Sequence, residues 1–117
     1  MIETARAQRG APYRLGGADP SGFDCSGLVK YVFQQHAITL PRTTAEQARV
    51  GMKIDRDRIA AGDLVFFSTT GRGTTHVGIA LDHETFIHAP DTGAVVRVER
   101  LDAPYWKRRL VTVKRVT

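Results

Sequence analysis

A change of pattern at Gly62 restricts the fold of this sequence more than any other feature. Beyond Gly62, short runs rich in β-branched and aromatic residues are bounded by Gly, Pro and Asp, which is typical of strands. They are residues 63–67, 75–81, 85–89, 94–98 and 110–116. Before Gly62 the apolar spacing is helical. Because helices come first and strands follow, we expect an α+β fold in which N-terminal helices pack on a mostly antiparallel sheet.

The N-terminal part of the chain carries the predicted helices. Residues 2–9 predict a short helix that stops at Gly10. Residues 26–36 predict an amphipathic helix with Asp24 as its N-cap. Its buried face would carry Leu28, Val29, Val32 and Phe33.

A further short helix is predicted to begin after residues 43–44 and to run through about Val50. Capping-box spacing occurs twice ahead of it, in Thr43 with Glu46 and in Thr44 with Gln47. Between the first two helices, the Gly- and Pro-rich segment 16–22 predicts a loop.

The composition is that of one packed domain, and we expect residues 1–117 to form a single domain without a linker. Hydrophobic residues make up 42% of the chain and charged residues 25%, which argues against a disordered or fibrous protein. The N-terminus has no apolar run of signal-peptide length, and no segment approaches the roughly 20 apolar residues of a membrane-spanning helix. We expect a water-soluble monomer that needs no cofactor.

The charge is basic, with 17 Lys and Arg against 12 Asp and Glu, a net charge of +5. Such a balance favours an anionic partner. The basic residues are scattered, apart from one cluster at residues 107–109, and no aromatic-rich basic motif accompanies them. Specific nucleic-acid binding is therefore not expected.

Cys25 is the only cysteine, so an internal disulfide is excluded. A lone cysteine is more often a packing residue than a catalytic one. Cys25, however, falls in the first turn of the helix predicted to follow Asp24, where the helix dipole and free N–H groups stabilise a thiolate. A thiolate becomes a catalyst only when a base lies close, most often a histidine that a third group orients.

His76 and His88 lie in neighbouring strand runs that predict a hairpin. A connection of odd length places both histidines on one face of the sheet, whereas a two-residue turn would separate them. We expect an odd loop or a bulge here, and the odd loop considered is a three-residue loop at 81–83. This loop pairs Ala80 with Glu84, Gly78 with Phe86 and His76 with His88. The small residues on the His76 face would then leave room for the Cys25 helix.

Zinc binding uses the same residue types and remains an alternative, with Asp24 as a fourth ligand beside Cys25, His76 and His88. No CxxC or HxxxH spacing supports it. The remaining histidines, His36 and His83, fit helix capping and solvent exposure better.

These residues resemble the NlpC-type cysteine peptidases, a family of bacterial cell-wall hydrolases. The matching segments occur in order along most of the chain. They are PYRLGG at 12–17, GFDCSGLV at 22–29, LPRTT at 40–44, GDLVFF at 62–67, HVGI at 76–79 and FIHA at 86–89. The order of DCSGLV, HVGI and FIHA is the specific part of the resemblance.

The resemblance implies a minimal papain-like fold with a five- to six-stranded sheet. It also implies that Cys25 is the nucleophile, His76 the general base and acid, and His88 the residue that orients His76. Substrate contacts are implied for four further residues, namely Tyr13, Asp24, Ser26 and Arg42. The substrate would be a peptidoglycan stem peptide, cut between γ-linked D-glutamate and meso-diaminopimelate or lysine. The protein would then act in the periplasm or, secreted, at the cell wall.

Several alternatives stay open from the sequence. The same scaffold could carry an amidase or acyltransferase that acts on another amide, or a wall-binding module that has lost catalysis. An antibacterial toxin or a phage lysis enzyme would use the same chemistry. Ala80 stands where relatives commonly have an aromatic residue, which would open the sheet near His76, and the segment 106–109 has no assigned counterpart in the family.

Overall fold

The structure, a computed structural model, describes residues 1–116. Its helices are α1 (Ile2–Arg6), α2 (Cys25–Gln34), α3 (Thr44–Gln47) and α4 (Pro104–Arg109), with a 3-10 helix η1 at Arg56–Arg58. Its strands are β1 (Ala18–Asp19), β2 (Gly22–Phe23), β3 (Met52–Lys53), β4 (Leu64–Phe67), β5 (His76–Ala80), β6 (Thr85–His88), β7 (Arg97–Arg100) and β8 (Leu110–Arg115). None of the described helices is both long and apolar enough to cross a membrane.

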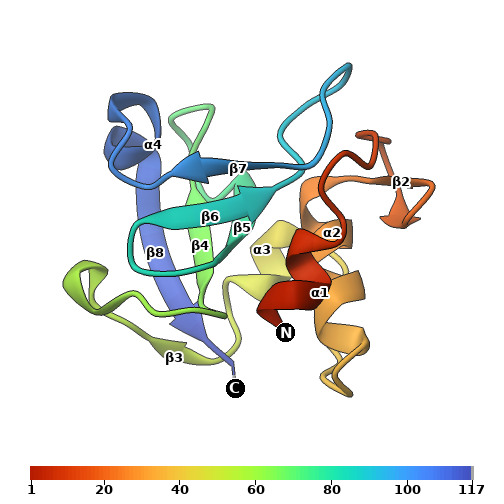
Figure 1. The fold of residues 1–117 in the computed structure, drawn as a ribbon. Helices are drawn as coiled ribbons and strands as arrows, with labels where there is room; N and C mark the ends of the chain where they lie inside the picture. The colour runs from red at the N-terminus through yellow and green to blue at the C-terminus, as the bar shows by residue number, and fades with distance from the viewer. Residues whose placement is uncertain (117) are drawn as a thin grey trace.

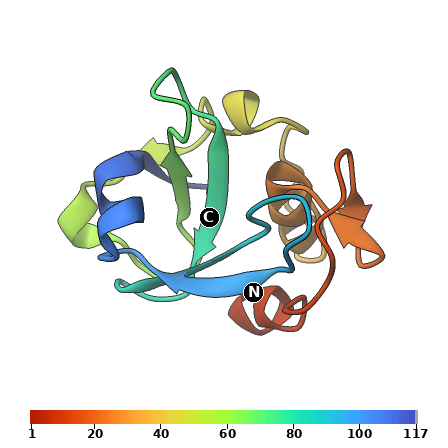
Figure 2. The ribbon, with the colours of Figure 1, turned by 90° about the horizontal axis from the view of Figure 1, so that it is seen from above.

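Six of these strands form one sheet in the order β3-β8-β4-β5-β6-β7, and every neighbouring pair is antiparallel. Helices α1 and α2 lie on one side of this sheet and α4 lies on the other (Figures 1 and 2). The predicted α+β class with a mostly antiparallel sheet is confirmed.

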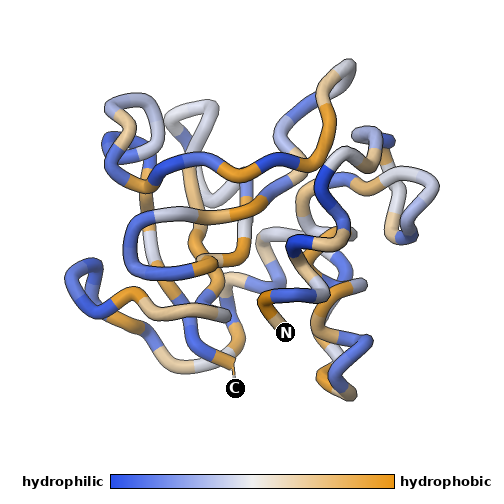
Figure 3. The backbone as a smooth tube through the Cα atoms, in the orientation of Figure 1, coloured by the Kyte–Doolittle hydropathy of each residue, from blue (hydrophilic) through white to orange (hydrophobic). Residues whose placement is uncertain are grey.

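Two apolar clusters fill the two faces of the sheet. On the α2 face, the four apolar residues predicted for the helix pack with β4, β5 and β6 through Phe66, Val77, Ile79 and Ile87. On the opposite face, Trp106 of α4 packs with Val65, Phe67, Ala80, Phe86 and Val113. Figure 3 shows the hydrophobic positions gathered along α2 and the central strands, with hydrophilic positions in the loops.

The β5–β6 hairpin keeps the predicted odd loop but shifts it by one residue. Ala80 pairs with Phe86 and Ile79 with Ile87, so the loop is 82–84 and not 81–83. The Asp82 carboxylate causes the shift, because it accepts hydrogen bonds from the backbone N–H groups of Glu84 (2.8 Å) and Thr85 (2.7 Å). His76 and His88 therefore share a face as diagonal neighbours, and the prediction that they lie directly opposite each other is wrong.

The expectation that the Cys25 helix approaches the His76 face is also wrong, because α2 packs on the other face. Small residues at positions 78 and 80 make room for aromatic rings instead. A Cβ atom on Gly78 would lie 2.8 Å from the Phe86 ring and 3.2 Å from the Cβ of His88. Ala80 is fully buried in the Trp106 cluster, so it does not open the sheet.

Helix boundaries match the predictions with small differences. The first helix ends at Arg6 rather than near Arg9, and Gly10 follows with a φ of +88°. Asp24 caps α2 as predicted, and Thr43 caps α3 by accepting from the Glu46 N–H. The glycine-rich loop contains the small β1–β2 hairpin, the run 94–98 becomes β7 at Arg97–Arg100, and the unassigned segment 106–109 lies in α4.

Candidate active site

Cys25 is the first residue of α2, where the chain turns out of the β1–β2 hairpin. The Asp24 carboxylate fixes this turn by accepting from the Gly27 N–H at 2.7 Å. Only glycine fits at position 27, because a Cβ atom there would lie 2.0 Å from the Gly17 carbonyl oxygen. Cys25 is half-buried, and the described residues provide no acceptor for its backbone N–H. The sulfur therefore stands beside a free donor at a helix start.

Thr44, the first residue of α3, contacts Cys25. Its Oγ1 lies 3.4 Å from the Cys25 sulfur, and this is the one hydrogen bond of the Thr44 hydroxyl among residues 1–116. Thr44 is buried, so its hydroxyl hydrogen-bonds to the sulfur and not to water. From the sequence, Thr44 was predicted only as a helix cap.

His76 and His88 meet on the α4 face of the sheet. Nε2 of His76 lies 2.7 Å from Nδ1 of His88, and the two side chains are almost fully buried. Burial, and after it the neighbouring His88, lower the pKa of His76 to about 3 against a smaller opposing effect of Glu99. Burial also lowers the pKa of His88 to about 4. Both rings are therefore neutral near pH 7, which disfavours a resting thiolate beside an imidazolium.

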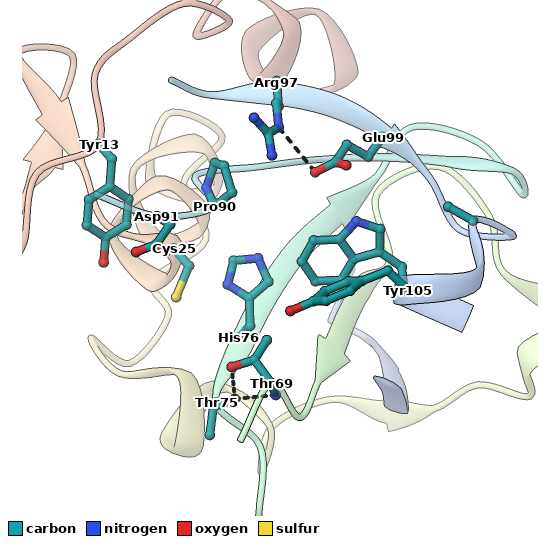
Figure 4. A pocket seen from close by; sticks show the side chains of 12 residues that line it. Tyr13, Cys25, Thr69, Thr75, His76, Pro90, Asp91, Arg97, Glu99 and Tyr105 are labelled. Carbon is teal, nitrogen blue, oxygen red and sulfur yellow. Dashed lines mark hydrogen bonds and ion pairs between the residues drawn. The ribbon is translucent and has the colours of Figure 1, made fainter. Parts of the chain in front are cut away.

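Cys25 and His76 line a common cavity of about 520 Å³. Figure 4 shows a ring nitrogen of His76 turned toward the Cys25 sulfur, with Tyr13 on the far side of the sulfur. Burial raises the pKa of Tyr13, and the nearby Cys25 and Asp24 raise it further, so its hydroxyl stays protonated. The remaining lining residues are Thr69, Thr75, Pro90, Asp91, Arg97, Glu99, Ala103, Tyr105 and Trp106.

Glu99 and Trp106 extend the histidine pair, and the sequence analysis missed both. Oε2 of Glu99 lies 2.6 Å from Nε2 of His88 and 3.2 Å from Nε of Arg97. The Trp106 ring stacks on His76, with ring centres 5.5 Å apart and planes at 26°, and meets His88 edge to face at 5.0 Å. Because β7 pairs His88 with Arg97, the period of two in a strand would have placed Glu99 on the histidine face, had the register been known.

Asp24, Ser26 and Arg42, all predicted to contact substrate, form one polar cluster beside Cys25. Arg42 donates to both carboxylate oxygens of Asp24 at 3.1 and 2.9 Å and to the Ser26 hydroxyl at 3.0 Å. Burial opposes ionisation of Asp24, but the hydrogen bonds from Arg42 and Gly27 outweigh it and lower the pKa of this carboxyl. Among the described residues, Tyr13 lines the cavity and these three do not. Their role toward substrate stays a prediction.

The other histidines lie apart from this site. His36 is exposed at the end of α2 and hydrogen-bonds the Thr4 hydroxyl at 2.8 Å, and His83 is exposed in the β5–β6 loop. Within residues 1–116, no group of three or more His, Cys, Asp or Glu side chains is placed to hold a metal ion.

Nearly the whole chain, including the segments that carry Cys25 and His76, matches a family of known proteins. The model of the NlpC/P60 family matches residues 10–115, which is nearly the whole chain. The chain belongs to the NlpC/P60 family. The resemblance seen in the sequence is thereby confirmed.

Two curated relatives of this NlpC/P60 domain differ in the bond they are named for. The chain is 45% identical over 114 residues to murein DD-endopeptidase MepH of Escherichia coli, covering 93% of this chain and 42% of MepH. It is 42% identical over 118 residues to a gamma-DL-glutamyl hydrolase of Bacillus subtilis, covering 98% of this chain and 28% of that protein. The chain thus spans less than half the length of either relative.

A solved structure agrees with the fold over the same range. The NlpC/p60 domain of the peptidoglycan hydrolase SagA superposes with a TM-score of 0.86 at 37% identity, covering 98% of this chain and 95% of that domain.

Proposed function

We propose that this domain is a cysteine endopeptidase that hydrolyses an amide bond in peptidoglycan stem peptides, with Cys25 as nucleophile, His76 as general base and acid, and His88 as the residue that orients His76. One observation carries this proposal. Cys25 and His76 line the same cavity, and His88 holds the ring of His76 through a 2.7 Å hydrogen bond. Nucleophile, base and orienting group are the three parts that acyl transfer by a thiol requires.

In the proposed reaction, neutral His76 takes the thiol proton as the sulfur of Cys25 attacks the amide carbonyl carbon. The carbonyl oxygen becomes an oxyanion, for which the free N–H of Cys25 is the nearest candidate donor. The amide C–N bond then breaks, and His76 gives its proton to the leaving amine. A thioester remains on Cys25.

Water completes the cycle. His76 removes a proton from water, the resulting hydroxide attacks the thioester carbonyl, and the C–S bond breaks. His76 returns the proton to the sulfur, and a carboxylic acid leaves. Neither step needs a cofactor.

For the bond that is cut, we propose the amide between γ-D-glutamate and meso-diaminopimelate or lysine. The gamma-DL-glutamyl hydrolase relative supports this choice. The DD-endopeptidase name of MepH, at 45% identity, favours a second candidate, the D,D-amide of the cross-link between two stem peptides. Tyr13 borders the sulfur, and Asp24, Ser26 and Arg42 surround the helix start, so these four residues are the proposed substrate contacts.

For a peptidoglycan substrate, we propose that the protein acts in the periplasm or, secreted, at the cell wall. We also propose that it is a monomer. A net charge of +5 would draw the domain toward an anionic wall, an attraction that salt screens. Amidase or acyltransferase activity on another amide, or binding without catalysis, would show as different products or as none.

Digestion of defined peptides tests the proposal. One substrate carries the γ-D-glutamyl–diaminopimelate bond, one carries lysine in the third position, and one is a D,D-cross-linked dimer. Mass spectrometry of the products identifies the bond that is cut. We expect hydrolysis by the wild type and none by Cys25→Ala, whose circular dichroism spectrum should match the wild type. Full activity of Cys25→Ala, or binding of all three peptides without products, would refute the proposal.

A further inference from the structure

Glu99 closes a hydrogen-bond chain that begins at the cavity and runs through both histidines. We propose that Glu99 is a positioning residue, which keeps a proton on Nε2 of His88 and thereby leaves the nitrogen of His76 that faces Cys25 free to accept one. This inference rests on the proposed function for its catalytic meaning. The proton positions themselves can be measured in the resting protein.

The first step concerns the charge on Glu99. Its side chain is 27% exposed, and burial alone would favour the neutral acid. Polar hydrogens of Trp106, His88 and Arg97 surround the carboxylate and outweigh burial, so the pKa of Glu99 is lowered. Arg97 contributes through its Nε, at 3.2 Å from the Oε2 that His88 also contacts. Glu99 is therefore an anion near pH 7.

The second step follows from the chemistry of a carboxylate. An ionised carboxylate accepts hydrogen bonds and has no proton to donate. The 2.6 Å contact between Oε2 of Glu99 and Nε2 of His88 consequently requires the hydrogen to be on Nε2. His88 is neutral near pH 7, so its Nδ1 carries a lone pair.

The third step identifies which nitrogen of His76 carries the hydrogen. The lone pair on Nδ1 of His88 accepts from Nε2 of His76 at 2.7 Å, so Nε2 of His76 carries that ring's hydrogen. His76 is neutral as well, which leaves its Nδ1 bare. Because Nε2 is engaged by His88, Nδ1 is the nitrogen that Figure 4 shows on the side of the Cys25 sulfur. The chain thus presents a proton acceptor to the thiol.

Without the Glu99 carboxylate, the remaining neighbours of His88 favour the other tautomer of both histidine rings. With the carboxylate gone, the N–H groups of Arg97 and Trp106 that stabilise it lose their acceptor, and a bare Nε2 on His88 would offer them one. The hydrogen of His88 would then move to Nδ1, and Nε2 of His76 would have to accept. His76 would hold its hydrogen on Nδ1, and its lone pair would point away from Cys25.

Glu99 also has a role during the reaction. When His76 takes the thiol proton it becomes an imidazolium in a buried place, where charge is unfavourable. The Glu99 anion lies two hydrogen bonds away and offsets part of this penalty. The transferred proton stays on Nδ1 of His76 until the leaving amine takes it, and Glu99 remains ionised throughout.

Three substitutions separate positioning from mere packing. Glu99→Met removes the acceptor with little change in length, and Glu99→Gln keeps one oxygen that can accept from His88. Glu84→Met is the matched control, because Glu84 is exposed, pairs with Arg100 at 3.0 Å and does not line the cavity. We expect kcat/KM to fall by about 10–100-fold in Glu99→Met, mainly through kcat, and by less in Glu99→Gln. Glu84→Met should match the wild type.

The tautomer of each histidine ring is measured by ¹⁵N NMR of labelled histidine near pH 7. This measurement would not change if Glu99 had only a structural role. We expect Nε2–H tautomers for both His76 and His88 in the wild type, and a shift toward Nδ1–H in Glu99→Met. An Nδ1–H tautomer of His76 in the wild type would overturn the inference without any variant. Unchanged tautomers and unchanged kcat/KM in a folded Glu99→Met protein would overturn it too.

The proposed function can fail separately. If none of the peptides is cut, the rate of Cys25 alkylation by iodoacetamide replaces kcat/KM as the measure of proton acceptance by His76. A slower rate in Glu99→Met than in Glu84→Met would then support the inference, and equal rates would contradict it.

Discussion

The two halves of the candidate site differ in how they treat charge. The nucleophile half begins at Cys25 and is half-exposed, with the ionised pair of Arg42 and Asp24 at 2.9 Å beside it. The base half lies in the sheet, where His76 is 5% exposed, His88 is fully buried and Trp106 covers both rings.

This difference shows where each charge of the reaction is accommodated. Free N–H groups at the start of α2 can stabilise negative charge at any time, because they are part of the backbone. Burial disfavours the imidazolium form of His76. That form is therefore expected only while His76 holds the proton that it took from the thiol. The two histidines of the base half are therefore neutral and oriented in the resting site. The Glu99 anion offsets part of the cost of charging His76 during the reaction.

After the complete loss expected of Cys25→Ala, the largest effect is expected from breaking the base half at His88. His88→Ala removes the group that orients His76 and leaves a hole under Trp106. We expect kcat on the stem peptide to fall by about 10²-fold or more, since a misoriented base loses most of its contribution. His36→Ala is the control, because His36 is exposed and outside the cavity. Equal rates for His88→Ala and the wild type would remove His88 from the mechanism.

Acid should destabilise the base half before it affects the carboxylates. Unfolded histidines titrate near 6.5, whereas the pKa values in the fold are lowered to about 3 for His76 and about 4 for His88. Below about pH 6.5 the unfolded chain therefore binds more protons. The free energy of unfolding should be insensitive to these groups above that pH and fall below it, by up to about 1.4 kcal/mol per pH unit for each histidine.

Urea unfolding between pH 7.5 and 5 measures this slope in a range above most carboxylate titration. His88→Asn should flatten the slope, and the exposed control His36→Asn should leave it unchanged. A wild-type slope no steeper than that of His88→Asn would show that the buried pair is not neutral in the fold.

A smaller effect is expected from the Arg42–Asp24 pair beside Cys25. Arg42→Met removes two hydrogen bonds to Asp24 and one to Ser26, leaving a carboxylate that is only 15% exposed. We expect a loss of about 1–2 kcal/mol in the free energy of unfolding, because partial exposure of Arg42 weakens the pair. Arg42→Lys, which keeps the charge without the planar fork, should recover part of it. An unchanged urea midpoint for Arg42→Met would refute a bracing role.

The smallest effect is expected at Thr44, whose hydroxyl contacts the sulfur at 3.4 Å. Thr44→Val keeps the shape and removes the hydrogen bond, which is worth about 0.5–1.5 kcal/mol or roughly 2- to 10-fold in rate. Alkylation of Cys25 by iodoacetamide should slow by that factor, while Thr44→Ser should react like the wild type. Faster alkylation of Thr44→Val would mean that the hydroxyl only shields the sulfur.

Local sequence patterns predicted what depends on near neighbours. The cap at Asp24 and the helix start at Cys25 follow from residues a few positions apart, whereas the odd hairpin loop followed from the hypothesis that His76 and His88 share a face. The register within that hairpin could not be fixed by counting alone, because the Asp82 side chain selects the loop residues. The shift of the loop by one residue changes each cross-strand partner by two positions. Both histidines still lie on one face of the sheet, because the loop has an odd number of residues in the prediction and in the structure.

Local patterns could not predict the site residues that lie far from Cys25 and the histidines in the sequence. Glu99 meets His88 only because β7 pairs with β6, and Trp106 covers His76 only because α4 folds back over the sheet. The face on which α2 packs was mistaken for a similar reason. Small residues at 78 and 80 signal that something bulky lies close, and the sequence does not tell a helix from an aromatic ring.

The proposed mechanism requires a covalent intermediate at Cys25. Mass spectrometry of the acid-quenched protein, after brief mixing with the γ-D-glutamyl–diaminopimelate peptide, tests this most directly. We expect a thioester on the fragment that contains Cys25, with the amine product released in equal amount. Hydrolysis that continues at the wild-type rate after Cys25 has been fully alkylated, with no adduct on that fragment, would contradict it.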